Sequence, residues 1–174
     1  MNKNCAWIFK IIIISFIISI FFSFVSEITI PNFNILLGIL VCILFIFVGI
    51  IFDMIGTSVT ASDISVLNSM ASNKIRGAKL AVKLKKNADK VSSFCNDVVG
   101  DISGIVSGSA GIVIALRISS LLNTNTLITT LLVTGIISSI TIGGKAIFKG
   151  IAIKKSNTIL YRFALFLSLF YRSR

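Results

Sequence analysis

The chain contains no histidine, and acidic residues are scarce: 6 Asp and Glu stand against 17 Lys and Arg in 174 residues. The absence of imidazole excludes histidine metal sites and histidine-based acid–base catalysis. The three cysteines lie far apart and show no C-x-x-C spacing. We interpret Cys5, Cys42 and Cys95 as reduced and structural, with Cys5 a minor candidate for lipidation.

Charged residues of both signs make up only 13% of the chain, whereas 55% is hydrophobic and the mean hydropathy is +1.00. An ordinary soluble domain is about 45–50% apolar and about 25% charged. The composition therefore predicts a membrane protein. The net charge of +11 favours anchoring to an anionic inner leaflet over binding of nucleic acid, because the basic residues alternate with apolar spans. The lipid bilayer is thus an expected partner and nucleic acid is not.

Four segments are long and apolar enough to cross the hydrocarbon core, which takes about 20 residues. They lie at about 8–26, 35–58, 92–116 and 126–147. The first imitates a signal peptide, but Phe24 occupies the position three before the best cleavage site, where a small residue is required. We therefore expect an uncleaved signal anchor and an all-α, polytopic helical membrane protein whose single domain covers 1–174.

The loops differ in their basic residues, and this difference predicts the orientation in the membrane. Residues 27–34 carry no basic residue and 117–125 carry only Arg117, whereas 60–91 carry seven and the tail after the fourth span carries six. Because basic loops stay in the cytoplasm, we expect a multi-pass protein of the cell (inner) membrane with both termini in the cytoplasm.

The segment 60–90 is typical of a helical hairpin. Its first residues, TASD (60–63), have the S/T-x-x-D form of a helix start. Four apolar residues then recur at helical spacing: Ile64, Leu67, Met70 and Ala71. Asn73 is expected to start a second short helix and Asn87 to introduce the third span. We predict that this hairpin lies on the inner membrane face with its lysines toward the headgroups; the alternative is a solvated basic loop.

The tail 157–174 is apolar on nearly all faces over about 13 residues, which is too short to span a bilayer. Tyr161–Arg162 and Tyr171–Arg172 bracket this stretch, and such residues are typical of membrane interfaces. We therefore expect an interfacial helix over 157–172.

Three aspartates fall inside the predicted spans, where carboxylates are costly and usually face a cavity, a partner or a substrate. Asp97 and Asp101 are four residues apart and share one helix face. At about 1.5 Å per residue, Asp97 lies about 9 Å and Asp101 about 15 Å from the cytoplasmic end of their span, and Asp53 lies about 10 Å from the end of its own. Lys145 enters the fourth span from the same side, so all four residues are expected in the inner half of the bilayer.

The residues alone leave two interpretations of this cluster open. In the first, Lys145 neutralises one or more aspartates and the cluster fixes the register of the helices. In the second, the aspartates form an oxygen-rich cation site together with Asn96, Ser58 and Ser103. Oxygen ligands suit Mg²⁺, and Ca²⁺ or Mn²⁺ similarly, but a neighbouring ammonium group opposes cation binding by several kcal/mol if unscreened.

Residues 50–152 resemble the transmembrane domain of the CorB/CorC and cyclin M family of magnesium transporters. RGAKLAVKLKKNADK (76–90) is similar to the cytoplasmic helical hairpin of that family. VVGD (98–101) lies where the family has I-G-N-N, and GKAIFK (144–149) falls in register with the closing motif G-E-x-x-P-K. The resemblance implies a homodimer that transports a divalent cation, Mg²⁺ or Co²⁺.

The chain departs from the family pattern at the residues that would bind the ion. The family's site uses serine or backbone oxygens of the first core span, asparagine of the second and the closing Glu; Ser58 and Asp101 match the first two roles. Lys145 replaces the closing Glu, and the Glu that follows the family's first core span falls near Gly56. The regulatory nucleotide-binding modules of the family are not among these 174 residues.

The leading hypothesis is a transporter of Mg²⁺ that alternately exposes the region of Asp53, Asp97 and Asp101. The alternative is a non-transporting relative in which Lys145 locks the site and the protein serves as a membrane scaffold or partner subunit. A holin-like pore is disfavoured, because a lytic pore does not require an acidic cluster in the membrane. An enzyme is not expected, because no nucleophile–base pair and no phosphate loop is present.

Overall fold

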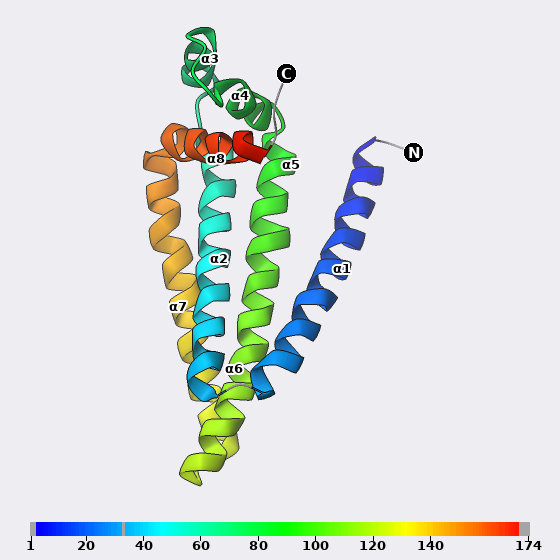
Figure 1. Cartoon of the computed structure of the whole chain (residues 1–174), viewed down its shortest axis with the longest axis vertical. Coiled ribbons are helices and arrows are strands. Elements are labelled where there is room, and N and C mark those ends of the chain that lie inside the picture. The colour runs from blue at the N-terminus through cyan, green and yellow to red at the C-terminus, as the bar shows by residue number, and fades with distance from the viewer. Residues whose placement is uncertain (1–2, 33, 171–174) are drawn as a thin grey trace. The chain divides into compact units, whose positions relative to one another are not determined.

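The computed structural model describes residues 3–32 and 34–170, and within these ranges the protein is all-helical, as the sequence predicts (Figure 1). The elements in chain order are α1 (Lys3–Asn32), α2 (Ile35–Ala61), α3 (Ile64–Ser72), α4 (Ala78–Lys86), α5 (Ala88–Ser93), the π-helical segment η1 (Phe94–Gly100), α6 (Asp101–Leu122), α7 (Thr126–Lys154) and α8 (Ser156–Phe170). The side chain of Cys5 lies outside the described part, so its lipidation stays a prediction.

Four helices in the described part of the chain are long and apolar enough to cross a membrane. They lie at Trp7–Val25, Ile35–Ala61, Ala88–Leu122 and Thr126–Lys154. This result confirms the four predicted spans and supports a multi-pass membrane protein in contact with lipid. The third span is longer than predicted, because α5, η1 and α6 follow one another without a break.

Several predicted helix boundaries are wrong. The loop expected over 27–34 is helical up to Asn32, and Phe33 lies outside the described residues. Helix α1 continues beyond the predicted span and ends at Asn32, one residue after Pro31, the only proline of the chain. Asn73 ends α3 rather than starting α4. Asn87 does precede α5, as predicted.

The start of the hairpin also differs from the prediction, because Thr60 still belongs to α2. Asp63 is the residue that caps α3, and its carboxylate accepts a hydrogen bond from the backbone N–H of Ser65 at 2.8 Å. This backbone bond, the Ser65 hydroxyl and the nearby Lys85 ammonium hold the pKa of Asp63 below its ordinary value. Its stabilising contribution is therefore present at neutral pH and is lost only as the pH falls through the lowered pKa.

The helices divide into two compact units. The first comprises Met1–Ile50 and Val98–Gly144, and the second comprises Ile51–Asp97 and Lys145–Arg174. The division runs through the continuous helices α2 and α7 and through η1. The single domain expected from the sequence stays a prediction.

Apolar side chains join α1 to α6 in the first unit. Three buried residues of η1 and α6 form the cluster, and three half-buried residues of α1 and α2 pack against them: Val98, Ile102 and Val106, with Ile11, Ile18 and Phe45. The rings of Phe22 and Phe45 meet edge to face with their centroids 5.7 Å apart. Most other large side chains of α1 are exposed and apolar, which suits a surface that faces lipid.

Small residues bring α2 and α6 close together in the same unit. A Cβ atom added to Gly49 would lie 3.1 Å from the Cβ of Ser103, and the thiol of Cys42 donates to the carbonyl of Ser107 at 3.5 Å. Close approach through small residues is typical of helices in membranes. Gly104 and Gly108 lie outside this contact, because an added Cβ would meet no described atom within 4 Å at either position.

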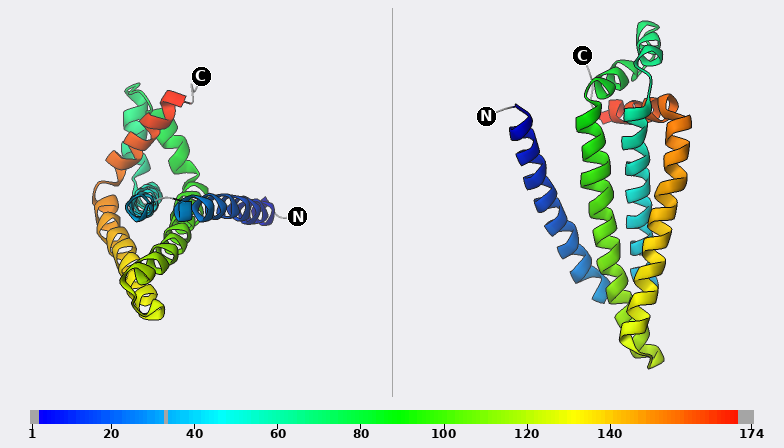
Figure 2. Two further views of the ribbon diagram at one scale, coloured as in Figure 1. Left: turned by 60° about the horizontal axis from the view of Figure 1, so that its bottom comes forward. Right: turned by 180° about the vertical axis from the view of Figure 1, so that it is seen from behind.

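The second unit contains the predicted helical hairpin, formed by α3 and α4, and α8 packs across α4 (Figures 1 and 2). Seven buried residues form its core: Ile55, Val59, Leu67, Ala81, Cys95, Leu160 and Ala164. These come from α2, α3, α4, η1 and α8. The helix predicted over 157–172 is therefore α8, although residues 171–174 lie outside the described part.

The turn between α3 and α4 depends on Gly77. Its φ angle is +82°, in the left-handed region that favours glycine. A Cβ atom at this position would also lie 3.1 Å from the Cα of Leu165 on α8. Glycine is therefore required both by the backbone conformation and by the close approach of α8.

We expect Gly77→Ala to lower the free energy of unfolding by about 1–2 kcal/mol, which is the cost of the left-handed conformation for a residue with a Cβ. Thermal unfolding in detergent, followed by circular dichroism, measures the change. Gly150→Ala on α7 is the matched control, because a Cβ there meets no described atom within 4 Å. An equal loss of stability in both variants would contradict this account.

Candidate functional site

Polar groups gather at the end of α2, where the last carbonyl groups of a helix have no partners in a following turn. The ammonium group of Lys85, on α4, donates to the carbonyls of Val59 at 3.1 Å and Thr60 at 2.7 Å. The hydroxyl of Ser156, at the start of α8, donates to the carbonyl of Ala61 at 3.3 Å. A cation at the C-terminal end of a helix is also favoured by the helix dipole. These bonds tie α4 and α8 to the end of α2.

The inward direction of Lys85 corrects the prediction that all lysines of the hairpin point toward headgroups. Lys85 is half-buried, whereas Lys79, Lys83 and Lys86 on the same helix are exposed. The carbonyl groups at the end of α2 explain the difference, because they offer a charge-assisted hydrogen bond close to the hairpin. Another bond joins α8 to the start of α3: the backbone N–H of Asp63 donates to Oδ1 of Asn157 at 2.8 Å.

The third span departs from α-helical geometry over η1, Phe94–Gly100. A π-helix has an i→i+5 hydrogen-bond pattern; it is rare and often occurs at functional sites. The segment contains Asn96 and Asp97, and Asp101 follows it directly. Three of the residues predicted to bind a cation therefore lie in or next to this segment.

The side chain of Asn96 packs against Gly56 of α2, within the second unit. A Cβ atom added to Gly56 would overlap Oδ1 of Asn96 and would lie 3.1 Å from the Cβ of Cys95. Nδ2 of Asn96 donates to the hydroxyl of Ser92 at 3.3 Å. Oδ1 of Asn96 is buried and accepts no hydrogen bond from any described residue. Such an atom costs about 1–3 kcal/mol, so it is a natural position for a ligand.

The other predicted ligands of the second unit have different surroundings. Ser58 is fully buried, and its hydroxyl donates to the carbonyl of Ile55 at 2.7 Å, which leaves its oxygen as an acceptor. Asp53 is half-buried and Asp97 is exposed. Both carboxylates belong to candidate membrane spans. A charge there is costly unless it faces a partner, a cavity or a substrate.

Asp101 belongs to the first unit and is exposed. Lys145 belongs to the second unit and is half-buried. In the ranges 3–32 and 34–170, no three side chains of the His, Cys, Asp and Glu types lie close enough together to hold a metal ion. A cation site here would therefore use neutral oxygens beside the carboxylates. The ligand set Asp53, Asn96, Asp97, Asp101 and Ser58 stays a prediction, as does its neutralisation by Lys145.

Sequence reasoning missed Gly56 and the π-helical geometry of η1. Gly56 is the position near which the family resemblance places a Glu, and that departure was the one available signal. The structure gives a reason for glycine there, because any Cβ would displace Asn96. Nothing in the composition of FCNDVVG distinguishes a π-helix from an α-helix.

Comparison of the chain with models of protein families, with curated proteins and with solved structures gives no match. The resemblance to the CorB/CorC and cyclin M family therefore stays a prediction that depends on the quoted motifs.

We expect Gly56→Ala to lower the free energy of unfolding by about 1–3 kcal/mol, as for other groups forced into a packed interior. Adding Asn96→Ala should restore part of the loss, because it removes the atom that the new methyl group overlaps. A double-mutant cycle on thermal unfolding in detergent measures this coupling. Gly143→Ala, where an added Cβ has no described neighbour within 4 Å, should change stability little. Additive effects of the two substitutions would show that Gly56 and Asn96 do not pack together.

Proposed function

We propose that this chain is a multi-pass membrane protein that binds and translocates a divalent cation, with Mg²⁺, or Co²⁺, as the expected cargo. The observation that carries the proposal is Oδ1 of Asn96, which is buried and accepts no hydrogen bond from the described residues. It belongs to a π-helical segment inside an apolar span. A polar oxygen without a donor is expensive at membrane depth, and a bound cation would compensate for that cost.

We expect the ion to be weakly held and to keep part of its water. Mg²⁺ gives up its water reluctantly and is usually held by one or two carboxylates together with water. Asp97 lies in the same segment, and Ser58 and Asp53 lie on α2 in the same unit. One carboxylate with neutral oxygens therefore suffices, and a cluster of three acids is not needed. A site of this kind would release its ion readily, which transport requires.

The π-helical segment suggests how access to the ion could alternate. A change between π-helical and α-helical geometry would rotate Asn96 and Asp97 about the axis of the span without unfolding it. The rotation would change which neighbouring helices the two side chains face, and so which side of the bilayer the ion could reach. The homodimer implied by the family resemblance is part of the same hypothesis.

Mg²⁺ should raise the unfolding temperature of the purified protein, because a ligand that binds only the folded state stabilises it by mass action. At a concentration of about 100 times Kd the gain is about 2.7 kcal/mol. We expect Asn96→Leu and Asp97→Asn each to weaken the apparent Mg²⁺ affinity at least about tenfold, equivalent to about 1.4 kcal/mol. Asp89→Asn, an exposed residue of α5, removes the same charge and should leave the shift unchanged.

Two results would contradict the transport proposal. If Mg²⁺ stabilises only a Lys145→Glu variant, the native site is locked, and the protein acts as a scaffold or partner subunit. If Mg²⁺ stabilises the native protein equally with and without Asn96, the ion binds elsewhere. Mg²⁺ flux into liposomes that contain the protein then distinguishes binding alone from transport. The variant Asp101→Asn tests whether the remaining predicted carboxylate contributes to Mg²⁺ binding.

We also propose that both termini and the α3–α4 hairpin lie in the cytoplasm, because the basic residues concentrate there. Ser72→Cys on α3 and Thr124→Cys between α6 and α7 place thiols at exposed positions. In intact cells a membrane-impermeant maleimide should label only Thr124→Cys, and both variants should react after the cells are opened. Labelling of Ser72→Cys in intact cells would reverse the orientation.

A further inference from the structure

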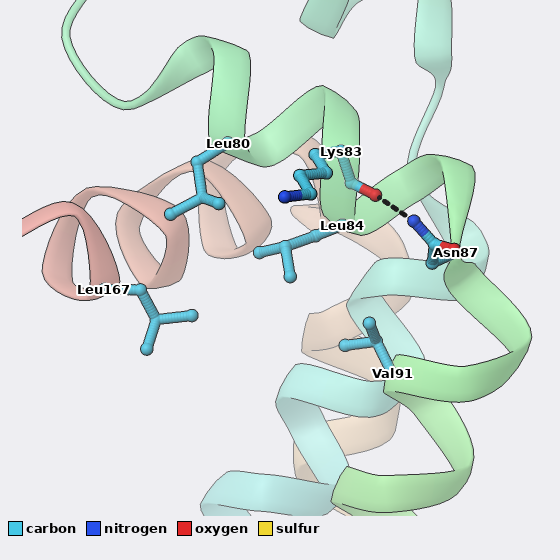
Figure 3. Close-up of a pocket in the computed structure, with 6 residues that line it drawn as sticks. All are labelled: Leu80, Lys83, Leu84, Asn87, Val91 and Leu167. Carbon is cyan, nitrogen blue, oxygen red and sulfur yellow. Dashed lines mark hydrogen bonds between the residues drawn. The ribbon is translucent and has the colours of Figure 1, made fainter. Parts of the chain in front are cut away.

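A pocket of about 380 Å³ opens in the second unit between α4, α5 and α8 (Figure 3). Its lining is mostly aliphatic, with two polar residues: Leu80, Leu84, Val91 and Leu167, with Lys83 and Asn87. Figure 3 shows Leu80, Lys83 and Leu84 projecting from α4 on one side, with Leu167 below them on α8. The side-chain amide of Asn87 donates to the carbonyl of Lys83 at 2.9 Å, which secures the end of α4.

The charge around this pocket is strongly positive. Four exposed lysines lie on or just after α4: Lys79, Lys83, Lys86 and Lys90. Asp89 is the one acidic residue of the segment 78–90. The fifth lysine, Lys85, donates to the carbonyls at the end of α2. Lys83, which lines the pocket, and the positive charge of this segment therefore favour an anionic occupant, whereas the aliphatic walls favour an apolar one.

The position of the pocket along the chain matches the edge of a bilayer. Val91 lies in the first turn of the candidate span Ala88–Leu122, and the preceding helix α4 carries Lys79, Lys83 and Lys86. Phe166 and Leu169 add exposed apolar surface on α8 beside Leu167. Apolar walls near the end of a span with an adjacent basic helix are typical of sites where acyl chains meet anionic headgroups.

We propose that this pocket binds an anionic phospholipid, with its phosphate at Lys83 and part of an acyl chain along Leu80, Leu84, Val91 and Leu167. A membrane lipid fits better than a soluble phosphate, because the aliphatic walls would gain nothing from an inorganic anion. The bound lipid would hold α4 against α8. This inference is independent of cation binding, because none of the proposed cation ligands lines the pocket.

The test uses the full-length protein in neutral detergent, with unfolding temperature measured against added lipid. Long-chain phosphatidylglycerol should raise this temperature in a saturable way, and phosphatidylcholine should not. Lys83→Gln should weaken the apparent affinity for phosphatidylglycerol about fivefold, the effect of one basic residue near an anionic surface. Lys83→Arg should retain the affinity. Lys154→Gln, an exposed residue at the end of α7 in the same unit, is the matched control.

The aliphatic walls are tested separately with Leu167→Asn. This variant should weaken binding of long-chain phosphatidylglycerol and leave binding of the short-chain dihexanoyl form little changed. Equal weakening by Lys83→Gln and Lys154→Gln would overturn the proposal, because it would indicate charge without a site. Equal stabilisation by phosphatidylcholine would overturn it, as would inorganic phosphate binding as tightly as the lipid. The unfolding temperature without lipid verifies that each variant is folded.

Discussion

The carbonyl groups at the end of α2, which no following helical turn can pair, are the constraint on which the second unit depends. A long apolar helix that leaves the membrane must find donors for its last carbonyls. Lys85 supplies an ammonium group from α4, and Ser156 supplies a hydroxyl from α8. These three hydrogen bonds hold the hairpin and the last helix against α2, and the aliphatic core around Leu67 and Leu160 fills the space between them. Polar pairing and apolar packing therefore act at the same junction.

The first unit is held together by different interactions. Its contacts are aliphatic and aromatic side chains with close approaches at small residues, as between Gly49 and Ser103. Lipid tails are as apolar as these side chains, so association inside a membrane depends on packing rather than on the hydrophobic effect. Small residues therefore stabilise the first unit by allowing close packing. In the second unit, hydrogen-bond donors stabilise the end of α2.

Asn96 is the exception among the buried polar side chains that the structure describes in the second unit. Nearby hydroxyl groups donate to backbone carbonyls, as Ser58 does to Ile55, but Oδ1 of Asn96 has no donor among the described residues. Gly56 leaves the space that this side chain needs. The cation proposal and the lipid proposal thus concern two places in one unit with opposite chemistry. An oxygen acceptor inside the span suits a cation, and lysines beside an aliphatic pocket suit an anionic lipid.

The sequence by itself determined the four spans, the helical hairpin and the last short helix, because the length and periodicity of apolar runs are local properties. It also located the unusual polar residues of the third span. Only the tertiary structure decided that Lys85 turns inward, that Asp63 rather than Thr60 caps α3, and that Gly56 accommodates Asn96. Each of these depends on a partner from a distant segment or on where a helix ends. The pattern of residue types does not specify such partners, because these hydrogen bonds and close contacts form only when the helices pack.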